Sequence, residues 1–250
     1  MPSPARSPRS WAAEAAGLAL AAVVAVAGLA GCSGGLPTRG SGTVVDSARE
    51  VEPFDALAVD SAIEVSLAVG AEPAVLVRAD DNVQDLVAVQ VVDDTLTLDV
   101  RGSVIAATLE ATVTAPADAL TAIALDGASS LTATDEITSP ALDVSLGGAS
   151  RAFLVLAAGS VGLVADGAGV LNAAGTAASL EVIANGASSV QVSELTVATA
   201  SVDASGASRV HLTVTEQLEA TATGGSTVVF GGDPAEVTQD AQDGSTIRAD

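Results

Sequence analysis

The chain has 250 residues, of which 31 are acidic and 9 are basic, and its formal net charge at pH 7 is −22. All nine basic residues are Arg, and a surface this negative repels a phosphate backbone, which excludes nucleic acid as a partner. One His (His211), one Cys (Cys32) and no Tyr or Lys exclude most nucleophilic and His-centred mechanisms and leave carboxylates as the plentiful acid–base groups. We therefore expect no cofactor and no metal site.

The first 31 residues have the order of an export signal, with a basic start followed by a small, apolar run over residues 15–31. The run ends at Leu29, Ala30, Gly31 and Cys32. This ending resembles the lipobox of bacterial lipoproteins, in which the Cys is diacylated and becomes the first residue of the mature chain. The resemblance implies lipidation of Cys32 and a protein anchored by lipid to the cell membrane, on its extracytoplasmic face. The alternatives are a free core Cys and an uncleaved signal anchor.

Residues 32–44 are rich in Gly and Ser and are predicted to form a flexible tether. Residues 45–118 form the N-terminal, strand-rich part of one domain that continues to residue 250. Alternating apolar and polar residues predict strands over 57–65, 74–78, 87–92, 95–100 and 107–113. The segments 70–73 and 92–95 have the composition of hairpin connections, so we expect antiparallel pairing that caps one end of the domain.

Residues 119–250 contain an internal repeat whose copies share a Gly-Ala-Ser-like turn. The copies begin at Gly127, Gly148, Gly167, Gly186, Gly206, Gly224 and Asp243, which are 21, 19, 19, 20, 18 and 19 residues apart. Around each copy the apolar residues recur with the period of two that is typical of strands. A unit of this size cannot bury its apolar face alone but can do so against copies of itself. The sequence therefore predicts an all-β fold: a parallel β-helix-like solenoid of about seven turns of about 19 residues.

The phase of the repeat predicts which side chains face the core. The Ser two residues after each Gly has the inward phase, with Gly169 in the one gap, and its hydroxyl needs a partner on another hydroxyl or on the backbone. The segment Asp60-Ser61-Ala62 matches Asp126-Gly127-Ala128 and is interpreted as a degenerate first turn. The outward phase carries the candidate ligand-binding residues Asp126, Asp166, Asn185, Arg151 and Arg209. These residues form either a solvated face or a site for a polar ligand such as a glycan or Ca²⁺.

The order of motifs over residues 45–250 resembles a known family. Pro53-Phe54-Asp55-Ala56-Leu57, the Asp80-Asp81-Asn82 step, Leu96-Thr97-Leu98 and the serial Gly-Ala-Ser turns are similar to those of the GIN-domain lipoproteins, which are described as auto-transporter adhesin heads. The resemblance implies a right-handed β-helix-like fold and an extracytoplasmic location, and it brings no catalytic motif.

Three functions are compatible with these observations. The leading hypothesis is a non-enzymatic adhesion or interaction module that is held at the membrane by Cys32 and presents its surface to a glycan or an envelope protein. A second is an accessory sensor domain in envelope-stress signalling. A third is a polysaccharide-lyase-type enzyme, for which Asp126, Asp166 and Arg151 are the nearest candidates, although a polysaccharide groove normally carries aromatic side chains.

Overall fold

The computed structural model describes residues 36–116 and 120–250, and in these ranges the chain is almost entirely β-strand. The predicted signal, the lipobox residues and Cys32 lie outside the described residues. In chain order the strands are β1 (Thr38–Arg39), β2 (Val44–Arg49), β3 (Ala56–Val59), β4 (Glu64–Gly70), β5 (Ala74–Asp80), β6 (Val87–Val92), β7 (Thr95–Val100), β8 (Val104–Ile105), β9 (Leu109–Pro116), β10 (Ala122–Leu125), β11 (Ser130–Leu146), β12 (Arg151–Ala165), β13 (Val170–Ala184), β14 (Ser189–Ala204), β15 (Arg209–Ala222), β16 (Thr227–Gly231), β17 (Glu236–Ala241) and β18 (Thr246–Ala249). A short 3-10 helix, η1 (Gln84–Leu86), lies between β5 and β6.

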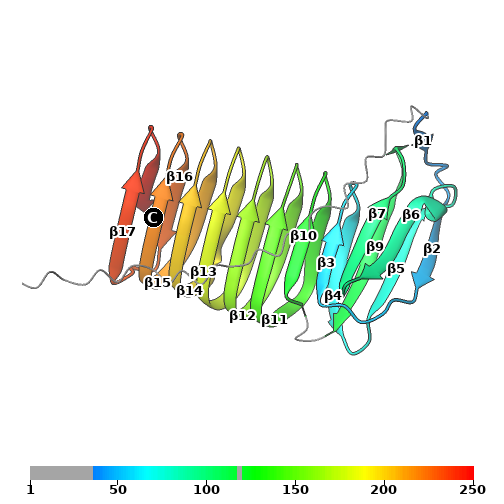
Figure 1. Cartoon of the computed structure of the whole chain (residues 1–250), viewed down its shortest axis with the longest axis horizontal. Helices are drawn as coiled ribbons and strands as arrows, with labels where there is room; N and C mark the ends of the chain where they lie inside the picture. Colours follow the sequence, from blue (N-terminus) through cyan, green and yellow to red (C-terminus); the bar gives the residue numbers. More distant parts are fainter. Residues whose placement is uncertain (1–35, 117–119) are drawn as a thin grey trace, which may run out of the picture. The chain divides into compact units, whose positions relative to one another are not determined.

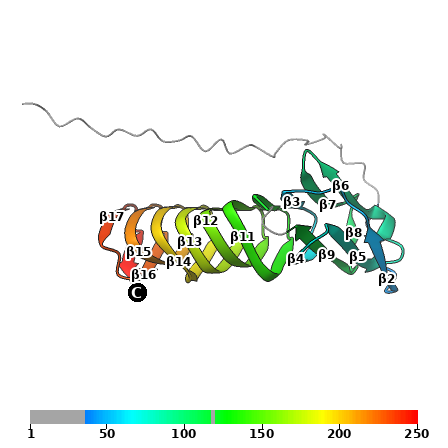
Figure 2. The same cartoon turned by 90° about the horizontal axis from the view of Figure 1, so that it is seen from below.

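The repeat forms the predicted β-solenoid, in which β10 to β18 stack as parallel strands. Figure 1 shows narrow tips along one edge of the stack and broad bends along the other, and Figure 2 shows the successive turns. We call the strand segments that follow each tip face A and the segments that precede each tip face B. In β12, for example, the buried positions change from even numbers (ending at Leu156) to odd numbers (starting at Val161) where the chain passes from face A to face B.

Each tip is built on a Gly with a left-handed backbone. Gly167 has φ +79°, and a Cβ at this position would lie 2.7 Å from the carbonyl oxygen of Gly148 in the preceding turn. That oxygen already accepts the hydrogen bond from the Ala168 amide at 2.8 Å, so neighbouring tips approach each other closely. Both the backbone conformation and the close approach therefore favour glycine. Ser61 and Asp243 take this position in the tips nearer the two ends.

The inward Ser column is confirmed, because Ser129, Ser150, Ser188, Ser208 and Ser226 are all buried. Where these hydroxyls have a partner, it is a backbone carbonyl and not another hydroxyl: Ser129 Oγ donates to Asp126 O at 2.9 Å, and Ser226 Oγ donates to Ala204 O at 2.9 Å. Gly169 interrupts the column, and a Cβ there would lie 3.2 Å from Leu146 Cβ of the preceding turn. Ser188 Oγ and Ser208 Oγ are buried without a hydrogen-bond partner, so what the whole column shares is a small inward side chain at each tip.

The degenerate turn around Asp60 is also confirmed, but it is not the outermost turn. Residues 122–125 of β10 pair with β3, and 130–133 of β11 pair with β4, both in parallel. On their other side, β3 pairs with β7 and β4 pairs with β9, again in parallel. The turn made by β3 and β4 therefore lies between a turn made later in the chain, β7 with β9, and the first regular repeat.

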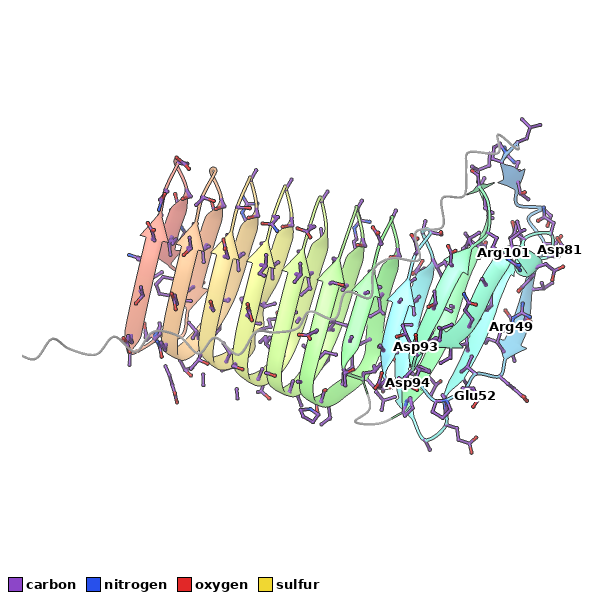
Figure 3. The ribbon with its side chains drawn as sticks, in the orientation of Figure 1. Arg49, Glu52, Asp81, Asp93, Asp94 and Arg101 are labelled. Carbon is purple, nitrogen blue, oxygen red and sulfur yellow. The ribbon has the colours of Figure 1, made fainter. Side chains whose placement is uncertain are left out.

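The N-terminal cap is antiparallel, as expected, but only one of the two predicted hairpins forms. Strands β6 and β7 pair antiparallel across Asp93 and Asp94, whose φ values of +49° and +58° match a two-residue hairpin turn; Figure 3 shows both side chains. The prediction for residues 70–73 was wrong, because β4 and β5 each pair with β9, which lies between them. A Gly/Pro turn reverses the chain direction without determining which strand fills the adjacent position.

The C-terminal end of the predicted tether, over residues 36–44, is bonded to the domain and does not act as a free linker. Within residues 36–44, the amide of Thr38 donates to Ser103 O at 2.8 Å, and the amide of Ser41 donates to the side chain of Asn82 at 3.0 Å. These contacts join the end of the predicted tether to the domain. Gly40 lets the backbone pass close to the buried Asp80, because a Cβ at this position would collide with the Asp80 carboxylate.

Candidate recognition surface

The predicted ligand residues Asp126, Asp166 and Asn185 belong to a ladder of residues that immediately precede the tip glycines. We call it the tip ladder, and its members are Asp60, Asp126, Gly147, Asp166, Asn185, Ser205, Thr223 and Gln242. Asp166 and Asn185 are neighbours: Asn185 Nδ2 donates to Asp166 Oδ1 at 2.8 Å, and Ser205 Oγ donates to Asn185 Oδ1 at 2.7 Å. Gly147 separates Asp126 from Asp166, so the structure brings together two of the three residues.

Arg151 and Arg209 lie on a different ladder, on face A. The register places Arg151 beside Val170, Val170 beside Ser189, and Ser189 beside Arg209. Three strand spacings, about 14 Å in total, therefore separate the backbones of the two Arg residues. Arg151 makes no ion pair with Asp126 or Asp166, all three of which the structure describes. Among the described residues, no group of three or more His, Cys, Asp or Glu side chains is arranged to hold a metal ion.

Face A also contains a shallow groove between two irregular strands. Thr132 and Glu136 of β11 pair with Phe153 and Val155 of β12. Three residues separate the β11 pair and one residue separates the β12 pair, so β11 contains two additional residues here. Between Gln191 and Glu194, β14 uses one more residue than β13. In these longer segments Thr134, Asp135 and Glu194 are exposed, as at a β-bulge, and β12 and β13 form the floor between them.

The groove has a volume of about 320 Å³ and an apolar floor framed by polar side chains. Its lining residues are Ala133, Phe153, Leu154, Val155, Asn172, Ala173, Ala174, Gln191, Ser193 and Glu194. Phe153 and Val155, on β12, are 45% and 40% exposed. Strand register places Asn172 beside Phe153 and Gln191 beside Asn172, while Glu136 lies beside Val155 and Glu194 beside Ala174. Amide and carboxylate groups therefore surround an exposed aromatic ring.

The groove was not predicted from the sequence, although the sequence contains a signal for it. Phe153 and Val155 share the outward phase of Arg151, where the repeat otherwise has mostly polar residues. Of the three Phe residues, all within the described part of the chain, Phe54 is buried, Phe230 is half-buried, and Phe153 is exposed. A bulky aromatic side chain at an outward position of a strand is the feature of the sequence that indicates a site on face A.

The two faces of the solenoid differ in charge. Over residues 120–250, all the basic side chains lie at outward positions of face A: Arg151, Arg209, His211 and Arg248. The outward positions of face B carry only acidic charges, namely Asp143, Asp203, Glu181, Glu219, Glu236 and Asp240. His211 Nε2 lies 3.4 Å from Asp250 Oδ2. Face A is thus electrostatically mixed, whereas face B is uniformly negative.

The fold defines the class of protein as a parallel β-solenoid with a capped N-terminal end and a shallow groove on one face. A family model described as "Putative auto-transporter adhesin, head GIN domain" matches residues 53–234, and the chain belongs to this family. The resemblance found in the sequence is thereby confirmed. No curated protein matches the chain.

Solved structures share the fold of this chain. A "putative adhesin" from Bacteroides fragilis has a TM-score of 0.78 at 18% identity, over 86% of this chain and 100% of that one. A "putative adhesin" from Parabacteroides merdae has a TM-score of 0.68 at 16% identity, over 85% and 98%. A "putative lipid binding protein" from Parabacteroides distasonis has a TM-score of 0.68 at 13% identity, over 86% and 100%. At these identities the likeness shows the fold alone.

The family is adhesin-like, which indicates a surface-exposed protein. In the part of the chain that the structure describes, no helix has the length and apolar character needed to cross a membrane.

Proposed function

We propose that the protein is a non-enzymatic adhesion module that is anchored to the extracytoplasmic face of the cell membrane through lipidated Cys32 and recognises its partner through the groove on face A. The groove is the observation that carries this proposal. Its exposed apolar floor, framed by a few polar groups, has the composition of a binding site, and its volume falls in the range of about 300 to 1,000 Å³ that small-ligand sites occupy.

The anchoring part of the proposal rests on the sequence around Cys32. The chain's one Cys stands directly after Leu29-Ala30-Gly31, at the position that the lipobox requires. The net charge of −22 keeps the protein away from an anionic bilayer, so a covalent lipid is the natural means of attachment.

The non-enzymatic part is supported by where the acid–base groups lie. The enzyme candidates Asp126 and Asp166 are separated by a turn of the coil, and Asp166 already accepts a hydrogen bond from Asn185. The groove itself is framed by amides and carboxylates around an aromatic floor, an arrangement that suits holding a ligand.

Membrane anchoring is tested by fractionating bacteria that export the full-length chain. We expect wild type in the membrane fraction and Cys32→Ser in the soluble extracytoplasmic or secreted fraction, because the serine variant lacks the thiol that carries the lipid. Ser33→Ala is the matched control and should remain with the membrane. Retention of Cys32→Ser in the membrane would instead support an uncleaved signal anchor.

Recognition is tested with the full-length chain in liposomes that are exposed to purified cell-wall, surface-glycan and envelope-protein fractions. We expect Phe153→Ala to abolish retention of a fraction, because it removes the exposed aromatic ring of the floor. Leu76→Ala removes a side chain that is similarly exposed (42%) on the cap, away from the groove, and should have no effect. Loss of binding in an Asp126/Asp166/Asn185 triple-alanine variant, with Phe153→Ala unaffected, would move the site to the tip ladder. Retention of no fraction by wild type would refute the recognition function.

A further inference from the structure

We propose that the groove on face A binds an uncharged glycan, with one sugar ring lying flat on Phe153. This inference rests on the proposed function and specifies the ligand of the same site. A sugar ring has an apolar face of C–H groups that packs on an aromatic ring, and a rim of hydroxyls that needs both donors and acceptors. The groove supplies this combination in one place.

The polar groups around the floor match the rim of a sugar. Asn172 and Gln191 continue the ladder of Phe153 on the next two strands, and each amide offers a donor and an acceptor. Glu194 and Ser193 line the groove from the β14 bulge. Neighbouring strands are about 4.8 Å apart, close to the length of one sugar ring, so a glycan lying across the strands meets a new side chain with each ring.

The charges around the groove favour a neutral occupant. Glu194 is the one charged side chain among the residues that line the groove, and Glu136 lies on the same outward ladder, whereas Arg151 and Arg209 lie on another ladder of face A and do not line the groove. The protein as a whole carries a net charge of −22, which disfavours phosphorylated or sulfated polymers. A cationic partner would find the uniformly negative face B, at Glu181 or Glu219 for example, more attractive than this mixed region.

A peptide is a poorer fit to the groove than a glycan. An extended peptide binds by adding a strand to a free sheet edge, but β12 and β13 are each paired on both sides. A helical peptide needs a long apolar groove for several anchors, whereas the exposed large apolar side chains here are those of Phe153 and Val155. The floor therefore offers side-chain contacts over a short length.

The experiment uses the full-length, lipid-anchored chain in liposomes on an array of neutral, acidic and amino glycans, followed by titration of the strongest neutral oligosaccharide. We expect Phe153→Ala to raise Kd by about tenfold or more, which corresponds to the loss of an aromatic contact of about 1.4 kcal/mol. Phe153→Trp should restore affinity because it keeps an aromatic surface. Leu76→Ala should match wild type, and Kd should change little between low and high salt.

Each other outcome overturns the inference. Binding confined to acidic glycans with a steep salt dependence would mean that charge, not the aromatic floor, selects the ligand. Neutral-glycan binding that survives Phe153→Ala would place the glycan elsewhere on the protein. Binding of no glycan, together with Phe153-dependent retention of an envelope protein, would refute the glycan while leaving the proposed recognition function in place.

Discussion

Substitution of a single tip glycine tests the stacking of the solenoid most directly. Gly167 has φ +79°, and a Cβ there would lie 2.7 Å from the carbonyl oxygen of Gly148. We expect Gly167→Ala to lower the free energy of unfolding, because an L-residue is disfavoured in this conformation and because the new methyl group must push one tip away from the next.

The magnitude follows from these two contributions. The left-handed conformation costs about 1 to 2 kcal/mol for a non-glycine residue. Overpacking by one carbon costs about 1 to 3 kcal/mol where the neighbour cannot move. Here the neighbour is backbone: the Gly148 oxygen also accepts the ladder bond from Ala168, so it cannot withdraw without breaking that bond. The expected loss is therefore about 2 to 5 kcal/mol.

Gly162→Ala is the matched control, five residues earlier in the same turn. Gly162 lies within β12, outside the left-handed region, and a Cβ there would meet the end of the Asp143 side chain, which can rotate away. The control should change stability by less than about 1 kcal/mol. The assay is chemical denaturation of the full-length chain followed by far-UV circular dichroism. Equal losses for the two variants would refute the account of the tip.

Two further predictions concern the inside of the coil and its edge. Ser188→Leu should destabilise the protein by about 1 to 3 kcal/mol through overpacking, because Ser188 is buried, whereas Ser189→Leu, one residue on and outward-facing, should be nearly neutral in the same denaturation assay; equal effects would mean that the inward phase is wrong. Asn185→Asp should destabilise by about 1 kcal/mol, because it replaces the donor to Asp166 by a like charge, and the loss should shrink when denaturation is repeated in high salt. A loss independent of salt would show that repulsion is not its cause.

The regular part of the fold could be predicted because one pattern determines it. Apolar residues at alternate positions, a Gly at each tip and a Ser two residues later specify the conformation, the inward phase and the stacking together. The buried Ser188 and the left-handed Gly186 of the same repeat follow from that pattern. The N-terminal part was harder to predict, since alternation gives the strands but not their neighbours. Nothing local in β4 or β5 shows that β9 lies between them.

The candidate site was only partly accessible from sequence, since it depends on side chains from different turns. Asp166 and Asn185 lie one repeat apart at the same position, so their contact follows from the period. Arg151 shares the polar, outward character of these two residues but lies on face A, after the tip. Outward polarity alone therefore cannot establish that residues share a site; the position within the turn must also match.

The lengths of the repeats indicate where the groove lies. The spacing from Gly127 to Gly148 is 21 residues and that from Gly186 to Gly206 is 20, while the two repeats between them have 19 each. The repeat that begins at Gly127 has two additional residues, and they are the two by which β11 is longer than β12. The repeat that begins at Gly186 has one additional residue, by which β14 is longer than β13. Because the tips and the core must stay in register, an insertion can be accommodated only as a bulge toward solvent. Two long repeats on either side of two regular ones therefore produce walls on either side of a floor, and the outward Phe153 lies on that floor.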